Sequence, residues 1–243
     1  MMKAMIYAAG LGTRLQPVTD SKPKALVEIA GTPMLGRLIE RLKTYDIEQV
    51  IINTHHFREQ IKAYLDRNNN FGIEIALSEE HEELLETGGG LANARWFLDG
   101  KDPFLIHNVD VLTDINLQDM LRFHEGQNPL ASLAVIERVT SRYLLFNEQM
   151  ALKGWMNSKT GKTILTDSPG IPLKKLAFSG IHVVSPDIFR YFTEIKRYRI
   201  IDKYLEISGK EHIAGYDHSE GYWFDMGSLE GVREAEKRLS KKA

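Results

Sequence analysis

Two groups of residues in this sequence have types and spacings that suit phosphate chemistry. The first follows the apolar run Lys3–Ala8 and consists of the loop AGLGTR (residues 9–14) with Lys24 further on. Glycines let a backbone approach an anion closely, and arginine and lysine neutralise its charge. The second group is Asp110 and Asp225, each close behind a short strand-like run. Because Mg²⁺ that is shared with substrate phosphates takes only one or two protein carboxylates, we expect Mg²⁺-assisted phosphoryl or nucleotidyl transfer.

The glycine loop differs from the two best-known phosphate-binding loops. A mononucleotide P-loop needs G-x-x-x-x-G-K-[ST], and no such run occurs here. A dinucleotide loop needs a third glycine, where this chain has Leu15, and an acid about 20 residues on, for which Glu28 comes too early. The loop therefore predicts a third kind of phosphate cradle, and a dehydrogenase is disfavoured.

No Ser/His/Asp set or thiol nucleophile stands out in the sequence. None is needed if the attacking group is a phosphate monoester, which is largely dianionic at neutral pH because its second pKa is about 6. Positioning and charge neutralisation would then provide most of the catalysis.

Composition restricts the partners. The 243 residues carry 31 basic and 33 acidic side chains, a formal net charge of -2, so no overall field attracts nucleic acid or an anionic membrane. The chain has no cysteine, no signal-peptide pattern and no apolar run near the length of about 18 residues that a membrane span needs. We expect a cytoplasmic protein that is a monomer or small homo-oligomer.

Periodicity shows which elements must position these residues. Helical spacing follows the apolar runs of the first half, with Thr32 as a predicted N-cap and Pro33 as the first helical residue. Strands alternating with helices over residues 1–125 predict an α/β fold with a mainly parallel central sheet covered on both faces. The runs of this half are Lys3–Ala8, Gln49–Asn53, Ile73–Leu77 and Phe104–His107.

The second half is richer in strand-like runs. It also has a helical segment from about Pro186 and a well-marked terminal helix after Ser228. No repeat or clear linker divides the chain, so we predict a single domain, 1–243, with a nucleotide-binding half (1–125) and an acceptor half (126–243). The strand-like runs are Ala131–Ile136, Leu144–Asn147, Leu176–Val184, His212–Tyr216 and Tyr222–Phe224.

Ligands of open α/β sheets lie at the carboxyl ends of the strands. At these ends the sequence places the glycine loop, Asn108 with Asp110, and Asp225. Between them, ETGGGL (residues 86–91) puts three glycines at a predicted helix N-terminus, where free backbone N–H groups can meet a base or a phosphate. We expect these four segments to meet over one cleft.

Longer motifs resemble those of the sugar-1-phosphate nucleotidyltransferase family. The run G-x-G-T-R-L-x-P-x-T over residues 10–19, followed by Pro23 and Lys24, is similar to that family's signature. Four further blocks resemble the small uridylyltransferases that activate N-acetylmuramate 1-phosphate: LLETGGGLANA, FLIHNVDVLTD, LAFSGIHVVSP and YWFDMGSLEGVREAEKRL. The resemblance implies a Rossmann-like nucleotidyltransferase fold and a reaction of an NTP with a sugar 1-phosphate that gives an NDP-sugar and pyrophosphate.

The resemblance also implies roles for individual residues. Arg14 would contact the triphosphate, Lys24 would lie near the α-phosphate, and Asp110 and Asp225 would hold Mg²⁺. The nucleotide would be lined by Ala9, Gly10, Gly12 and Thr13, with Thr87 and Gly88 on the base and Asn108 and Gly180 near the sugar phosphate.

The acceptor side departs from the family pattern. Val109 stands where relatives usually have glycine, and Ser141, Arg142 and Tyr143 occupy the region of an acidic sugar contact. The cation of Arg142 is suited to pair with an acidic sugar substituent such as a lactyl carboxylate, and a solvated arginine on a surface strand stays open as the alternative. A guanylyltransferase acting on mannose or heptose phosphate, a phosphocholine cytidylyltransferase and a non-catalytic sugar-nucleotide sensor stay open as alternatives.

Overall fold

The computed structural model describes residues 2–81, 83–166 and 172–240 as a mixed α/β structure. Its strands in the first half are β1 (Lys3–Tyr7), β2 (Glu28–Ile29), β3 (Thr32–Pro33), β4 (Gln49–Thr54), β5 (Glu74–Glu79), β6 (Phe104–Asn108) and β7 (Val111–Thr113). Those of the second half are β8 (Ala131–Ile136), β9 (Arg142–Phe146), β10 (Leu152–Asn157), β11 (Thr163–Leu165), β12 (Lys174–Val184), β13 (Ile213–Asp217) and β14 (Trp223–Asp225). The helices are α1 (Met34–Lys43), α2 (Arg58–Arg67), α3 (Glu86–Asn93), α4 (Arg95–Leu98), α5 (Leu117–Gln127), α6 (Ile200–Ile207) and α7 (Leu229–Ser240).

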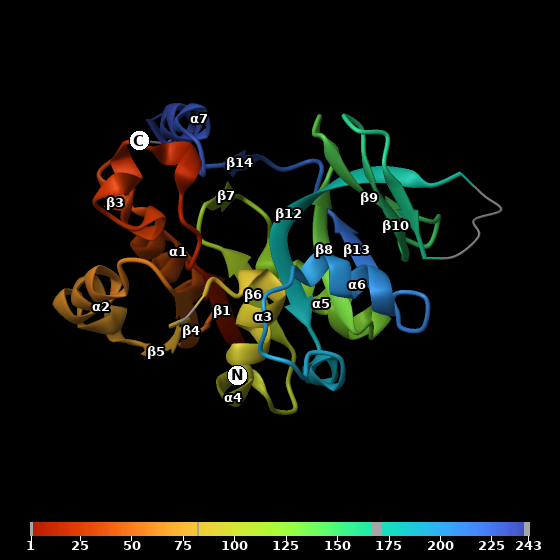
Figure 1. Ribbon diagram of the computed structural model, residues 1–243, viewed down its shortest axis with the longest axis horizontal. Helices are drawn as coiled ribbons and strands as arrows, with labels where there is room; N and C mark the ends of the chain where they lie inside the picture. The colour runs from red at the N-terminus through yellow and green to blue at the C-terminus, as the bar shows by residue number, and fades with distance from the viewer. Residues whose placement is uncertain (1, 82, 167–171, 241–243) are drawn as a thin grey trace.

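One ten-stranded sheet within the described residues joins both halves of the chain. In the first half β1 lies between β4 and β6, β5 borders β4, and all these pairings are parallel. The long strand β12 then pairs antiparallel with β6, β8 and β9 and carries the sheet into the second half (Figure 1). The predicted α/β fold with a mainly parallel centre is confirmed.

The side chains of the central strands alternate between two hydrophobic cores, one on each face of the sheet. In β1, Ala4 and Ile6 belong to the core on one face, and Met5 and Tyr7 belong to the core on the other. Successive side chains of a strand point to opposite faces, so a strand whose residues are all apolar must be covered on both sides. Helices α1, α2, α5 and α7 contribute to the first core, and α3, α4 and α6 contribute to the second.

Strand β14 and helix α7 return to the N-terminal half. Strand β14 pairs antiparallel with β7, which places Asp225 opposite Val111, and the backbone N–H of Met226 donates to the carbonyl of Asp110 at 2.8 Å. Helix α7 then lies beside the segment of β2 and β3, where Glu236 accepts a hydrogen bond from the Ala30 amide (Figure 1). This return brings residues from the two ends of the sequence to one site.

Several local predictions differ from the structure. Pro33 is the N-cap of α1, whereas we predicted Thr32 as the N-cap and Pro33 as the first helical residue. Both residues belong to β3, where Thr32 pairs with Ile29 and Pro33 with Glu28, so the helix begins one residue later than predicted. The predicted helix from Pro186 is a 3-10 helix of five residues, Pro186–Arg190. Helix α6 and the β10–β11 hairpin were not predicted from the periodicity.

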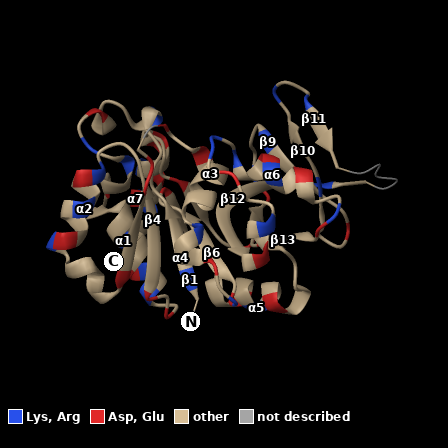
Figure 2. Cartoon of the chain, turned by 60° about the horizontal axis from the view of Figure 1, so that its bottom comes forward, with Lys and Arg blue, Asp and Glu red and all other residues tan. Residues whose placement is uncertain are grey.

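Charged residues lie mainly outside the sheet. In Figure 2 the strands are largely tan, and blue and red segments lie on the helices and the connecting loops without collecting on one side of this view. Among the described residues, no helix has the length and apolar character that crossing a membrane requires.

Three buried histidines make stability depend on pH. Burial lowers the pKa of His107 and His124 to about 4 and that of His182 to about 3. The unfolded chain therefore binds more protons below the ordinary pKa of 6.5, so this part of the stability is complete above pH 6.5 and is lost as the pH falls toward 4. At pH 5 each of these histidines should lower the free energy of unfolding by about 1–2 kcal/mol relative to neutral pH.

We predict that His124→Asn reduces the difference in unfolding free energy between pH 7 and pH 5. The ring of His124 hydrogen-bonds Ser132 through Nδ1, which an asparagine amide can imitate without titrating. Urea unfolding at the two pH values measures the effect, with His212→Asn as an exposed control. If His124→Asn loses as much stability as the wild type on acidification, burial of His124 does not contribute.

Candidate active site

The phosphate loop is fixed by the residues around it. Gly12 has φ +69°, and a Cβ there would lie 2.9 Å from Cγ2 of Thr19, so both conformation and space favour glycine. The Thr19 hydroxyl donates to the Gly12 carbonyl at 2.8 Å. Thr13 and Arg14 then lie in a short 3-10 turn, η1 (Thr13–Leu15), whose Leu15 is fully buried. The buried leucine where a dinucleotide loop has glycine anchors the turn that presents Arg14.

A buried polar network supports the beginning of this loop. The Ala8 amide donates to Oδ1 of Asn53, and Nδ2 of Asn53 donates to Oε1 of Glu80, both at 2.8 Å. Oε2 of Glu80 accepts from the Leu85 amide at 2.8 Å. Burial raises the pKa of Glu80, and the hydrogen bonds from Leu85 and Asn53 oppose this effect. The loop after β1 is thereby linked to the segment that leads into α3.

Two ion pairs join the N-terminal loop to the predicted metal ligands. Lys24 Nζ lies 2.8 Å from Oδ2 of Asp110, and both side chains are largely buried. Arg14 binds Asp225 through two N–H groups, at 2.7 and 3.3 Å, in a more exposed position. Burial raises the pKa of Asp225, but hydrogen bonds from Arg14 and the Gly227 amide hold that pKa below its ordinary value.

Gly227 is the point where these groups converge. A Cβ at this position would lie 2.5 Å from Nη2 of Arg14, 2.7 Å from Oδ2 of Asp110 and 2.8 Å from Oδ1 of Asp225. Only a residue without a side chain leaves room for this arrangement. The described residues hold no group of three or more His, Cys, Asp or Glu that could bind a metal, so a cation here would have two protein carboxylates and would need ligands from a substrate.

Two cavities meet beside this centre. The smaller, of about 190 Å³, is lined by Ala9, Gly10, Lys24 and Asp110 among others. The larger, of about 700 Å³, is lined by residues of the second half together with Arg14 and Asp225. Four residues line both cavities: Tyr7, Glu86, Thr87 and Asn108. A ligand in one cavity can therefore contact a ligand in the other.

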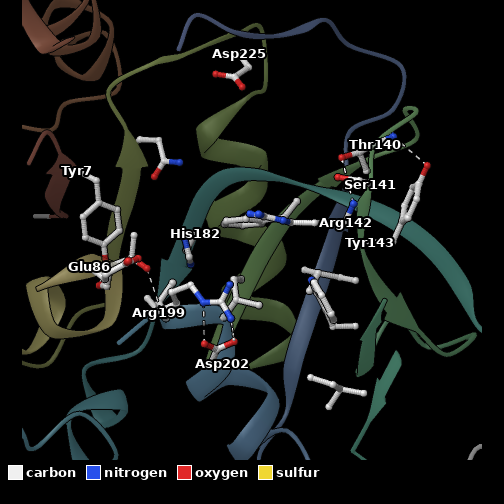
Figure 3. Close-up of a pocket in the computed structure, with 18 of the residues that line it drawn as sticks. Tyr7, Glu86, Thr140, Ser141, Arg142, Tyr143, His182, Arg199, Asp202 and Asp225 are labelled. Atoms are coloured by element: carbon white, nitrogen blue, oxygen red, sulfur yellow. Dashed lines mark hydrogen bonds and ion pairs between the residues drawn. The ribbon is translucent and has the colours of Figure 1, made fainter. Parts of the chain in front are cut away.

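Figure 3 shows the larger cavity with Asp225 at its upper end and the Arg199–Asp202 ion pair at its lower end. Tyr7 and Glu86 lie on one side, and the segment from Thr140 to Tyr143 lies on the opposite side. The Tyr143 hydroxyl accepts a hydrogen bond from the Thr140 amide at 3.0 Å, which shapes this segment. Both halves of the chain thus supply walls of one cavity.

The glycines of ETGGGL (residues 86–91) were predicted to offer free backbone N–H groups to a ligand, and the structure differs at Gly88. The Gly88 amide is not free, because it donates to the Tyr198 carbonyl at 2.8 Å, and Gly88 to Gly90 are buried in α3. A Cβ on Gly88 would lie 2.4 Å from the Tyr198 ring, so this glycine permits close packing. Thr87 lines both cavities, and its hydroxyl accepts from the Ile200 amide at 3.0 Å at the start of α6.

The remaining predicted residues lie close to the cavities. Gly180 has φ +77°, and a Cβ there would lie 2.6 Å from Nδ2 of Asn108, so these two residues are packed together across β12 and β6. Arg142 lines the larger cavity at the start of β9. Val109 is fully buried in the core, so its side chain does not obstruct the site.

Four residues near the site were not predicted from the sequence: Asn53, Glu80, Gly227 and Arg138, which lines the larger cavity. Asn53 lies at the end of β4, and Glu80 and Arg138 follow the ends of β5 and β8, so the strand-end rule is the sequence signal that points to these three. Gly227 carries no such signal, because its importance comes from side chains distant in sequence.

Comparison with known proteins identifies the family. The family model described as nucleotidyl transferase matches residues 3–242, and the chain belongs to this family. It is 32% identical over 239 residues to the N-acetylmuramate alpha-1-phosphate uridylyltransferase of Neisseria meningitidis serogroup B, with 97% of each chain covered. It is 40% identical over 137 residues to mannose-1-phosphate guanylyltransferase 1 of Arabidopsis thaliana, which covers 55% of this chain and 38% of the relative.

Solved structures agree on the fold. A UDP-glucose pyrophosphorylase complexed with UDP-glucose superimposes with a TM-score of 0.80 over 100% of both chains, at 20% identity. At that identity the likeness concerns the fold. The nucleotidyltransferase fold that the motifs predicted is thereby confirmed.

We predict that Gly227→Ala lowers nucleotidyl transfer by about 100-fold, because an added methyl group would displace the ends of Arg14, Asp110 and Asp225. The displaced atoms are ends of flexible side chains, so the melting temperature should change little. Gly126→Ala in α5 is the matched control, because a Cβ there meets nothing within 4 Å. Full activity in a folded Gly227→Ala variant would contradict the convergence of these side chains in the working enzyme.

Proposed function

We propose that this protein transfers a nucleotidyl group from UTP to N-acetylmuramate 1-phosphate and releases pyrophosphate. The observation that carries the proposal is the convergence of Asp110 and Asp225 beside Gly227, each in contact with a cation from the N-terminal loop. Support for the substrates comes from the name of the Neisseria relative, which matches nearly the whole length of the chain.

The two cavities suit two phosphorylated substrates. In this proposal the nucleoside triphosphate occupies the smaller cavity beside Ala9 and Gly10, with Gly12 and Thr13 in the same loop and Thr87 near the base. The sugar phosphate occupies the larger cavity with Asn108 at the boundary and Gly180 packed behind it. The close approach of the cavities at Tyr7 and Asn108 then brings the two phosphates together.

Asp110 and Asp225 fit a Mg²⁺ ion shared with the substrates. The ion would neutralise charge on the reacting phosphates when bound there. Each carboxylate now pairs with a cation, so a Mg²⁺ ion held by Asp110 and Asp225 would replace Lys24 and Arg14, which would then be free to contact phosphate oxygens. A guanidinium binds phosphate oxygens through paired N–H groups, and an ammonium acts as a compact charge.

The chain's own groups position a displacement at the α-phosphorus. An oxygen of the sugar 1-phosphate forms the new bond to that phosphorus while the bond to the oxygen of the leaving pyrophosphate breaks. Lys24, largely buried and held in place beside Gly10, stabilises the charge that gathers on the α-phosphate. Arg14 neutralises the phosphates that leave. No side chain has to remove a proton, because the attacking phosphate is already ionised.

Unpaired cations favour an acidic sugar. Arg142 and Lys162 line the larger cavity, and neither has an ion pair within the part of the chain that the structure describes. In the β9–β10 ladder Arg142 lies opposite Asn157, and the Asn157 amide donates to the Lys162 carbonyl at 2.8 Å. The two cations therefore lie on either side of Asn157, where the lactyl carboxylate of N-acetylmuramate can meet them.

We predict that the protein forms a UDP-sugar from UTP and N-acetylmuramate 1-phosphate. Product formation should be measured for UTP, GTP, CTP and ATP, each paired with N-acetylmuramate, mannose, heptose and glucose 1-phosphates and with phosphocholine. EDTA and Asp110→Asn or Asp225→Asn should each abolish most turnover if a shared Mg²⁺ is required. Preference for GTP with mannose or heptose phosphate, or for CTP with phosphocholine, would replace this assignment, and tight nucleotide binding without any turnover would indicate a sensor.

We predict that Arg142→Ala raises KM for N-acetylmuramate 1-phosphate by about 10-fold, since a charged hydrogen bond is lost, and leaves KM for UTP nearly unchanged. Steady-state kinetics with each substrate varied in turn measures the two constants. Arg233→Ala on the exposed face of α7 is the control. If both constants stay at their wild-type values, or if UTP is affected more, Arg142 has no role in acceptor binding.

A further inference from the structure

A third cation in the larger cavity differs from the other two in its surroundings. Arg138 is half-buried two residues after β8, and its Nε is buried without a hydrogen-bond partner. Its guanidinium makes one long hydrogen bond, from Nη2 to the Phe178 carbonyl at 3.4 Å, and has no ion pair with any described residue. By contrast, Arg14 and Arg199 in the same cavity are each held by a carboxylate.

An aromatic ring fixes the position of Arg138. The guanidinium carbon lies 4.0 Å from the centroid of the Trp223 ring, so the two groups are in cation–π contact. The indole N–H of Trp223 donates to the Ser179 carbonyl at 2.9 Å, which holds the ring in place. A guanidinium held on a rigid ring loses little conformational freedom when it binds an anion.

The same contacts place Arg138 beside the reacting centre. Trp223 and Asp225 belong to the same short strand, β14, and Ser179 directly precedes Gly180, which packs against Asn108. Arg138 therefore lies next to both the residues assigned to the sugar phosphate and a carboxylate of the metal site. Burial lowers the pKa of Arg138, and the negative charge of Asp225 raises it, as expected for groups within electrostatic range.

A partly buried cation without an acidic partner is unfavourable unless something supplies the opposite charge. Stacking on Trp223 offsets only part of this cost. The two terminal nitrogens of the guanidinium form a planar fork, which matches the oxygens of a phosphate better than those of a neutral hydroxyl group. An anion bound by Arg138 would lie near Trp223, away from Arg142 and Lys162, which lie at the β9–β11 side of the cavity.

We propose that Arg138, supported by Trp223, binds the phosphate group of the sugar 1-phosphate and orients its attacking oxygen toward the α-phosphorus. This inference rests on the proposed function and assigns a cation to the phosphate that acts as the nucleophile. The guanidinium stays protonated throughout, so its contribution is charge and orientation. Arg142 and Lys162 then contact the acidic substituent of the sugar, at a separate position.

Arg138 and Arg142, assigned to different groups of the substrate, should affect the binding of different sets of sugar 1-phosphates. The phosphate is common to every sugar 1-phosphate, so loss of Arg138 should weaken all of them. Loss of Arg142 should weaken only sugars that carry a second acidic group. Comparison of N-acetylmuramate 1-phosphate with N-acetylglucosamine 1-phosphate separates these effects, because the two differ only in the lactyl group that carries the carboxylate.

The test uses Arg138→Gln and Arg138→Lys in the full chain, with Arg67→Gln at the exposed end of α2 as a control. We expect Arg138→Gln to lower kcat/KM for both sugar 1-phosphates by about 10- to 100-fold, through a higher KM for the sugar 1-phosphate and a lower kcat, with KM for UTP changed less than about twofold. Arg138→Lys should recover part of the loss, because the charge is retained. A merely structural role of Arg138 would instead change the melting temperature and the KM for UTP, and lysine, which cannot stack as a planar group, would not rescue it.

Calorimetric titration tests the role of Arg138 by binding affinity alone, independently of catalytic turnover. Sugar 1-phosphate and the corresponding sugar without phosphate are titrated into the wild type and into Arg138→Gln, and only the phosphate-dependent part of the affinity should be lost. A folded Arg138→Gln variant that binds the sugar 1-phosphates as tightly as the wild type overturns the assignment of Arg138 alone. A wild type that binds and converts no sugar 1-phosphate with any nucleoside triphosphate contradicts the proposed function as well.

Discussion

Pairing of two carboxylates with two cations organises the site. Lys24–Asp110 and Arg14–Asp225 connect the loop after the first strand to residues contributed by the middle and the end of the chain. If one of the four charged groups were absent, its partner would be left as an uncompensated charge that is partly removed from water, which is unfavourable. The return of β14 to β7 and the missing side chain at Gly227 both serve to hold these charges together.

The same pairing has a thermodynamic consequence. Because the carboxylates and the cations satisfy each other in the structure, the proposed function implies that a metal ion and a triphosphate would be bound by exchange. A metal ion on the carboxylates would free Arg14 and Lys24 for phosphate, and a triphosphate on the cations would free the carboxylates for metal. The two proposed ligands would then favour each other's binding, as reciprocal linkage requires.

The acceptor side is built on different principles. Its cavity contains paired cations, such as Arg199 with Asp202, and cations without a carboxylate partner in the described part of the chain, such as Arg138. In the proposed function the paired charges maintain the wall and the unpaired charges select the ligand. The family alone does not specify the sugar, because relatives of this chain have differently named substrates.

The sequence by itself determined the alternation of strands and helices, the glycine loop with Arg14 and Lys24, and the two aspartates, because each depends on local pattern and spacing. It could not show that the Gly88 amide is occupied by Tyr198, that Thr32 pairs as a strand, or that Arg138 lies on Trp223. These contacts join residues that are distant along the chain or compete with local preference. Only the tertiary structure, through the pairing of β14 with β7, decided that Gly227 lies where the charges converge.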